Sequence, residues 1–121
     1  MKKIYYHKLI RDKIPEKMKK AGASFVVKKL NSKKYEKELI KKVGEESDGL
    51  LVAKSKDELV SELADVVEVM EEIKKFKRIS HKKLKEARKE NMSRKGGFKK
   101  RLYLVWAEDT GYRTNERKYK K

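Results

Sequence analysis

Carboxylates at helical spacing mark two stretches of the chain where chemistry is expected. Residues 42–53 (KVGEESDGLLVA) and 58–73 (ELVSELADVVEVMEEI) place acidic residues inside or beside the apolar stripe of an amphipathic helix. An unpaired charge in such a place is costly, and we expect no Lys or Arg on the two apolar faces to neutralise it. A divalent metal ion held by oxygen ligands would supply the positive charge. The pattern therefore predicts a metal site between two helices.

Three of these acids form the expected ligand set. Glu62 and Asp65 are three residues apart, so they face the same way on one helix and can share an ion. Glu46 lies on the apolar face of the other helix, between Val43 and Leu50. Mg²⁺ is the favoured ion, because it binds through few carboxylates together with substrate phosphates, and Mn²⁺ is the alternative. The competing interpretation is a structural seam in which lysines from nearby turns neutralise the same acids.

The same residues carry a resemblance to a known family. Residues 45–49 (EESDG) followed by 62–65 (ELAD) resemble the EExxE…ExxD signature of the MazG-like all-α nucleotide pyrophosphohydrolases. Residues 42–46 (KVGEE) are also similar to the helix opening of the phosphoribosyl-ATP pyrophosphohydrolases of the same superfamily. The flanks, 6–16 (YHKLIRDKIPE) and 94–106 (RKGGFKKRLYLVW), resemble the ends of small stand-alone members. The resemblance therefore covers most of the chain.

The resemblance implies a reaction and roles for individual residues. The reaction is Mg²⁺-dependent hydrolysis of a nucleoside triphosphate between the α- and β-phosphates, which gives the monophosphate and pyrophosphate. The implied metal ligands are Glu46, Glu62 and Asp65. Glu45 would be a supporting ligand or would orient the attacking water. The family carries a further metal-binding acid where this chain has Gly49, so that oxygen would come from water, from Asp48 or not at all.

Basic residues near both ends of the chain would hold the triphosphate. The residues that the resemblance implies are Lys8, Arg11 and Lys13, with Arg94 and Lys95 as weaker candidates. Arg can bind phosphate as a fork, whereas Lys acts as a point charge. Residues 11–13 also precede a short helix, with Asp12 as its expected N-cap and Pro15 in its first turn, and a helix N-terminus attracts phosphate. The alternative is that Asp12 only caps the helix and pairs locally.

Helices with short connections have to position these groups. We expect one short helix that ends near residue 22, and longer ones at about residues 33–53, 56–77 and 80–95. Ser32 is the expected N-cap of the second helix, and Ser55 with Glu58 predicts a capping box for the third. The short linker makes the second and third helices an antiparallel pair, which brings their acids level. Gly44 and Gly49, each costing about 1 kcal/mol relative to Ala, indicate close approach of a facing helix or a ligand.

The expected fold is an all-α antiparallel helical bundle of the all-α NTP pyrophosphohydrolase type, with short extended segments near the termini. We expect one domain over residues 1–121, with a mobile tail from about residue 108. Residues 24–30 (SFVVKKL) predict an extended connector or an edge strand, and 98–106 a short strand or an irregular cover over the bundle. Three aromatic side chains in the latter segment are expected in the core, with base stacking as the alternative: Phe98, Tyr103 and Trp106.

Composition sets the expectations about partners. Hydrophobic residues are 37% and charged residues 45% of the chain, which leaves thin apolar stripes that a partner chain often completes, so we expect a homo-oligomer, a dimer or a tetramer. The net charge of +17 should attract anions, and most of the lysines are interpreted as solvated surface. The sequence has no Cys, so disulfides and thiolate metal sites are excluded. No membrane span or signal peptide is expected, and we expect a soluble cytoplasmic protein.

Two other functions remain open at this point. The first is hydrolysis of phosphoribosyl-ATP, which the resemblance of residues 42–46 suggests. The second is a basic nucleic-acid-binding or regulatory module on a degenerate enzyme scaffold, suggested by the net charge of +17 and by Gly49.

Overall fold

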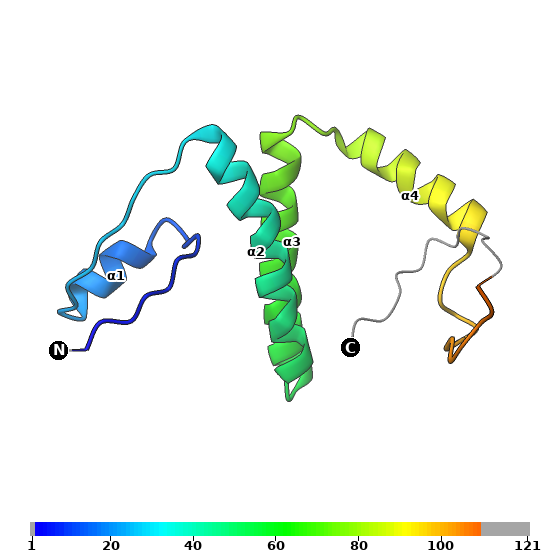
Figure 1. Cartoon of the computed structure of the whole chain (residues 1–121), viewed down its shortest axis with the longest axis horizontal. Helices are drawn as coiled ribbons and strands as arrows, with labels where there is room; N and C mark the ends of the chain where they lie inside the picture. The colour runs from blue at the N-terminus through cyan, green and yellow to red at the C-terminus, as the bar shows by residue number, and fades with distance from the viewer. Residues whose placement is uncertain (1, 110–121) are drawn as a thin grey trace. The chain divides into compact units, whose positions relative to one another are not determined.

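The computed structural model describes residues 2–109, and all of their regular secondary structure is helical (Figure 1). The helices are α1 (Ile14–Lys20), α2 (Ser32–Val52), α3 (Lys56–Phe76) and α4 (His81–Lys95). No strand occurs in residues 2–109, so the prediction of an all-α chain is confirmed. None of these helices combines the length and the hydropathy that crossing a membrane requires.

The chain divides into two compact units. The first unit is Met1–Leu84 and the second is Lys85–Lys121. Helices α1 to α3 lie in the first unit, and most of α4 lies in the second. The expected mobile tail lies, beyond Asp109, outside the described residues.

The starts of α1 and α2 differ by one residue from the sequence-based prediction. The N-cap of α2 is Asn31 and not Ser32, because the Asn31 side chain accepts a hydrogen bond from the Lys34 N–H at 2.9 Å. Asn is at least as good an N-cap as Ser, and two adjacent candidates cannot be separated by propensity alone. The N-cap of α1 is Lys13, which forms no side-chain cap, and the prediction of Asp12 at this position was wrong.

The start of α3 follows the predicted capping box. The Ser55 hydroxyl accepts a hydrogen bond from the Glu58 N–H at 3.1 Å. The Glu58 carboxylate reaches back and accepts one from the Lys54 N–H at 2.7 Å. Two backbone donors that the helix itself leaves without a partner are thereby satisfied.

Local signals also set the two ends of α4. The Ser80 hydroxyl accepts a hydrogen bond from the Lys83 N–H at 3.0 Å, which caps the first turn. Gly96 follows the last residue with φ +79°, in the left-handed region that favours glycine, and its N–H donates to the Met92 carbonyl at 2.8 Å. The helix therefore ends at the glycine pair, as predicted.

Helices α2 and α3 form an antiparallel hairpin and lie side by side (Figure 1). At the end away from the connecting loop, the Tyr35 ring packs edge-on against Phe76, with 5.1 Å between the ring centroids. The Lys77 ammonium forms an ion pair with the Glu36 carboxylate beside these rings. The start of α2 is thus fixed to the end of α3, which confirms the predicted antiparallel pair.

The core of the described chain is small. Leu39 of α2, 5% exposed, is the one fully buried hydrophobic residue in the described part of the chain. Four other residues of the predicted seam are half-buried: Val43, Leu50, Val66 and Ile73. Three other residues of the apolar stripe of α3 are 40–45% exposed: Leu59, Leu63 and Met70. A single neighbouring helix covers only part of an apolar stripe, so the rest of the α3 stripe stays open to solvent.

Two segments expected to be extended contain no strand. Residues 24–30 form an irregular connector between α1 and α2, one of the two alternatives considered. Residues 98–106 make one turn and then run on irregularly. The prediction that their rings belong to a core was wrong, because Phe98 is 97%, Tyr103 89% and Trp106 78% exposed. Within the described residues, this irregular segment therefore leaves its aromatic side chains open to solvent.

Candidate metal centre

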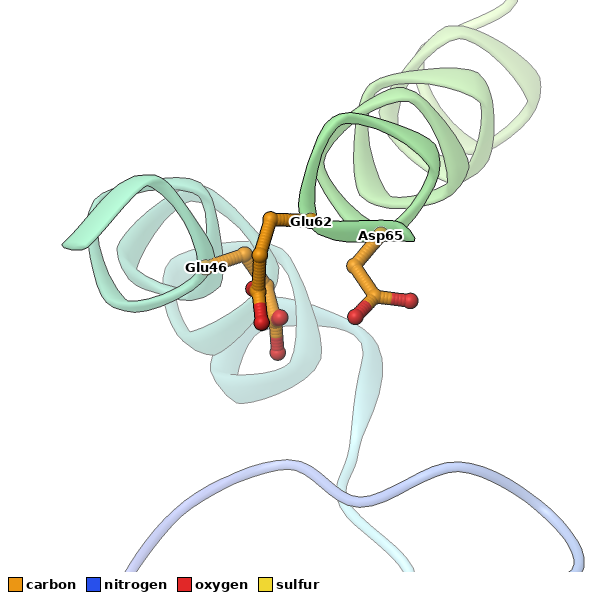
Figure 2. Close-up of side chains that lie close together, drawn as sticks. All are labelled: Glu46, Glu62 and Asp65. Atoms are coloured by element: carbon orange, nitrogen blue, oxygen red, sulfur yellow. The ribbon is translucent and has the colours of Figure 1, made fainter. Parts of the chain in front are cut away.

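Three carboxylates converge between α2 and α3. Glu46 of α2 and Glu62 and Asp65 of α3, called the acidic cluster below, each place one oxygen within 4.8 Å of the other two (Figure 2). All three residues are half-buried. Because the pair is antiparallel, residues far apart in sequence become level, and the i, i+3 spacing turns the two α3 acids the same way. The three residues predicted to lie together therefore do so.

The donor set of the acidic cluster suits a hard divalent cation. It offers only carboxylate oxygens, which are the ligands that Mg²⁺ and Ca²⁺ prefer. Softer metals favour nitrogen or sulfur ligands. Adjacent ligands of an octahedral Mg²⁺ ion lie about 3 Å apart and opposite ligands about 4.2 Å apart, so the cluster oxygens, which lie within 4.8 Å of one another, would have to move closer together to bind one ion. Small side-chain movements would bring the acidic cluster to the coordination distance of such an ion.

Two acids of the cluster already have protein cations, contrary to the expectation that their faces lack Lys and Arg. The Arg11 guanidinium donates to Asp65 at 3.0 Å, and the Lys42 ammonium lies 3.4 Å from Glu46. In residues 2–109, no Lys or Arg forms an ion pair with Glu62. Part of the salt-bridged seam is thus present, and Glu62 is the acid of the cluster that forms no ion pair in residues 2–109.

Glu45 is the residue before Glu46 in α2, and its carboxylate pairs with Lys8 of the N-terminal segment (residues 2–13). Lys8 and Lys42 each place an ammonium nitrogen 3.0 Å from its Oε1 atom. Partial burial raises the pKa of Glu45, but the hydrogen bonds from Lys8 and Lys42 outweigh it and hold the pKa below its usual value. The hydrogen bond to Glu45 raises the pKa of Lys8 in turn. At neutral pH, Glu45 is therefore a carboxylate that can accept hydrogen bonds.

The predicted phosphate ligands fall into two groups. Lys8 and Arg11 of the N-terminal segment are brought to the acids of α2 and α3, whereas Lys13 is exposed at the start of α1. Arg94 and Lys95 belong to the second unit, where the side chain of Arg94 pairs with two residues of its own helix, Asn91 at 2.9 Å and Glu90 at 3.8 Å. The roles of Lys13, Arg94 and Lys95 in phosphate binding stay predictions.

A pocket of about 510 Å³ lies between the N-terminal segment and α2. Its lining includes Tyr6 and Lys8 from the segment and Lys41, Lys42 and Glu45 from the helix. Lys42 connects the pocket to the acidic cluster, because its ammonium contacts both Glu45 and Glu46. Sequence reasoning missed Lys41 and Lys42. Lys42 could have been found from its spacing, because it stands three residues before Glu45 and four before Glu46, about one helical turn.

The two glycines of α2 have different surroundings. At Gly49, the position of an added Cβ lies 2.1 Å from Oε2 of Glu62, whereas at Gly44 it meets nothing within 4 Å. The predicted close approach of a facing helix is confirmed at Gly49 and is not found at Gly44, where approach of a ligand stays a prediction. The close neighbour of Gly49 is thus an acid of the cluster.

Comparisons with known proteins add no relative. A scan against protein-family models, a search of curated proteins and a search of solved structures each found no match to this chain. What is established is an all-α chain with four helices in its described part, two of which form an antiparallel pair. Membership of the MazG-like family stays a prediction that rests on the motifs quoted above.

Proposed function

We propose that this protein is a Mg²⁺-dependent nucleoside triphosphate pyrophosphohydrolase of the MazG-like type, which releases pyrophosphate and leaves the nucleoside monophosphate. The observation that carries the proposal is the convergence of the acidic cluster, whose oxygens from two antiparallel helices lie within 4.8 Å of one another. The resemblance of residues 45–49 and 62–65 to the EExxE…ExxD signature supports the same function.

Each group near the acidic cluster has a role in this reaction. When bound by Glu46, Glu62 and Asp65, Mg²⁺ would supply positive charge that neutralises the phosphate oxygens. The ionised Glu45 carboxylate would accept a hydrogen bond from the attacking water and orient it toward the phosphate. Lys8 and Arg11 would leave their carboxylate partners and bind the oxygens of the triphosphate, together with the exposed Lys13.

The charges around the site favour this exchange of partners. Glu45 and the acidic cluster present four carboxylates to three protein cations: Lys8, Arg11 and Lys42. A divalent cation that joins the carboxylates makes these side chains available, and the triphosphate brings them new anionic partners. Substrate and metal would therefore bind cooperatively, because each compensates charge that the other exposes.

Pyrophosphate release from a panel of NTPs and dNTPs, with and without Mg²⁺, tests the proposal. Glu62→Gln and Asp65→Asn keep the shape of each side chain but remove the charge that holds the metal. We expect turnover to fall more than about 100-fold in each, because several kcal/mol of transition-state stabilisation are lost. Full activity in either variant would defeat the assignment.

The matched control is Glu68→Gln, an exposed acid of α3 that forms no ion pair within the described residues. Its turnover should equal that of the wild-type chain. Circular dichroism must show the same helix content in all three variants, so that loss of activity is not loss of fold.

The second enzymatic candidate is phosphoribosyl-ATP pyrophosphohydrolase, favoured by the likeness of residues 42–46 to the helix opening of those enzymes. Both reactions would use the acidic cluster, so the variants above do not separate them. Turnover of phosphoribosyl-ATP, measured beside the NTP panel at equal concentration, decides between them by the larger kcat/KM.

A candidate from another class is a basic nucleic-acid-binding module, favoured by the exposed surface of the second unit. Helix α4 has no buried residue and ends in Arg94 and Lys95. The segment that follows exposes Phe98, Tyr103 and Trp106, and exposed rings among cations can stack on single-stranded bases. Gel shifts with single-stranded RNA and DNA across a salt series test this candidate. It requires steeply salt-dependent binding and no metal-dependent hydrolysis.

A further inference from the structure

Gly49 of α2 lies against the carboxylate of Glu62 from α3. A Cβ atom built on Gly49 would be 2.1 Å from Oε2 and 2.7 Å from Cδ of Glu62, whereas real Cβ atoms essentially never come closer than 3.0 Å to another heavy atom. The carboxylate therefore occupies space that any side chain at position 49 would fill. Glycine is the one residue that leaves this space free.

The carboxylate that occupies this space is also the member of the acidic cluster without a protein cation. Glu46 pairs with Lys42 and Asp65 pairs with Arg11, but no ion pair within the described residues holds Glu62. Its oxygen nevertheless lies within 4.8 Å of oxygens of both other acids. The surface of α2 at Gly49 is thus the feature that admits Glu62 to the cluster.

We propose that Gly49 is a positioning residue, whose missing side chain lets the Glu62 carboxylate lie against α2 and complete the acidic cluster for a divalent cation. The inference rests on the proposed function, because it assigns Gly49 a purpose at the same site. It also gives the departure from the family pattern a physical meaning. Position 49 contributes space for an existing ligand, and no oxygen of its own is required there.

Helix stability alone does not explain a glycine at this position. A glycine inside a helix is less stable than alanine, so Gly49 weakens α2. A methyl group here would be accommodated cheaply, because the neighbour it meets is the far end of the flexible Glu62 side chain. The carboxylate would swing away, the helix pair would persist, and the site would lose its third acid. Stability and metal affinity should therefore change in opposite directions.

The test is Mn²⁺ binding to the purified full-length chain, followed by electron paramagnetic resonance of the free ion, with thermal unfolding of the metal-free chain as the second readout. Gly49→Ala should weaken Mn²⁺ binding about 10- to 100-fold, the range seen when a group that orients a metal ligand is lost. Its Tm should rise by about 4 °C. The matched control is Gly44→Ala in the same helix, where an added Cβ meets nothing within 4 Å. It should gain the same Tm and bind Mn²⁺ like the wild-type chain.

The other outcomes distinguish a failure of the role proposed for Gly49 from a failure of the proposed function. If the wild-type chain binds Mn²⁺ and Gly49→Ala binds it equally well, the role of Gly49 is overturned and the proposed function stands. If Gly49→Ala loses both affinity and Tm relative to Gly44→Ala, the glycine serves helix packing, which also overturns the inference. If the wild-type chain binds no Mn²⁺, the proposed function fails and the inference fails with it.

Discussion

Arg11 illustrates how a single side chain can serve two partners at the candidate site. Its guanidinium lies 3.0 Å from Asp65, so it occupies a carboxylate that the metal would need. Both side chains are at least one-third exposed, and exposed ion pairs contribute only about 0.2–1 kcal/mol. A divalent cation can therefore displace Arg11 at low cost, and the freed guanidinium can bind phosphate.

Removing Arg11 should separate its two roles. Arg11→Ala takes away a competing cation, so we expect Mn²⁺ to bind up to about 5-fold more tightly, the equivalent of about 1 kcal/mol. The KM for the NTP should rise, because a phosphate ligand is also lost. The metal affinity comes from titration without nucleotide, and the KM from pyrophosphate release at saturating Mg²⁺.

Lys19→Ala on α1 is the control for Arg11→Ala, because Lys19 is exposed and its side chain forms no hydrogen bond or ion pair within the described residues. Neither quantity should change in it. A decrease in Mn²⁺ affinity in Arg11→Ala would show that Arg11 supports the site and does not compete with the metal.

At the residue scale, the sequence predicted where the acids lie but not which Lys and Arg side chains pair with them. Glu62 and Asp65 could be placed because helical spacing fixes their relative direction, and the short linker set the level of Glu46. The pairing of Arg11 with Asp65 could not be predicted in the same way. Arg11 belongs to a segment without regular structure, whose path has no periodicity to read. Lys42, one turn before Glu46, was predictable from its spacing and was missed.

At the scale of elements, the hairpin α2–α3 depends on how well each helix begins. The box formed by Ser55 and Glu58 begins α3 directly after the loop that reverses the chain. A helix that started later would lose its first turn and loosen the connection that keeps the acids level. Capping thus supports the geometry of the site from a distance along the helix.

Removing this cap should lower stability without touching the acids. Ser55→Ala is expected to reduce the free energy of unfolding by about 1 kcal/mol, because the Glu58 N–H loses its acceptor. Urea denaturation followed by circular dichroism measures the change. Ser61→Ala, at an exposed position inside α3, should be neutral or slightly stabilising. Equal stability of the two variants would contradict a capping role for Ser55.

At the scale of elements, the sequence is least informative where two residues of similar capping strength are neighbours. The start of α3 and both ends of α4 were predictable, because Ser55, Ser80 and Gly96 are each a strong local signal with no competing neighbour. The start of α2 was displaced by one residue, because Asn31 and Ser32 are neighbours with similar capping strength. Only the backbone conformation, extended at Asn31, decides which of them caps.

At the scale of the whole molecule, α3 carries a stripe of exposed apolar residues. Four residues follow one another at spacings of three and four and are 43–56% exposed: Val60, Leu63, Val67 and Met70. This spacing is typical of a helix that packs against another helix. With Leu39 as the one fully buried hydrophobic residue of the described part, one chain has little core of its own. We propose that a second copy of the chain covers this stripe, which would complete the predicted bundle.

A charge in the middle of the stripe should break this association. Val67→Glu would bury an unpaired carboxylate in the interface, so we expect the dissociation constant to rise more than about 100-fold. Light scattering after gel filtration should give at least twice the single-chain mass of 14.3 kDa for the wild-type chain, and the single-chain mass for the variant.

Ser61→Glu, which puts the same charge at an exposed position outside the stripe, should keep the mass of the wild-type chain. A wild-type chain of 14.3 kDa would show that the stripe is not an interface between copies.

Sequence reasoning was weakest for burial across the whole molecule. The all-α class followed from periodicity, which is a local property of the chain. Burial of Trp106 or Leu63 depends on what lies over them, and hydrophobicity alone does not report this. Both are exposed in one chain, Trp106 at 78% and Leu63 at 45%. The apolar residues of α3 could be found from the sequence, but not how far each of them is exposed.

The contact between Gly49 and Glu62 makes the effect of a mutation at one position depend on the state of the other. A side chain introduced at 49 would place its Cβ 2.1 Å from the present Glu62 carboxylate, so the benefit of an additional acid there depends on the rotamer of its neighbour. Such dependence is epistasis between facing helices. A substitution that adds a side chain at position 49 would require the Glu62 carboxylate to change its conformation in the same step.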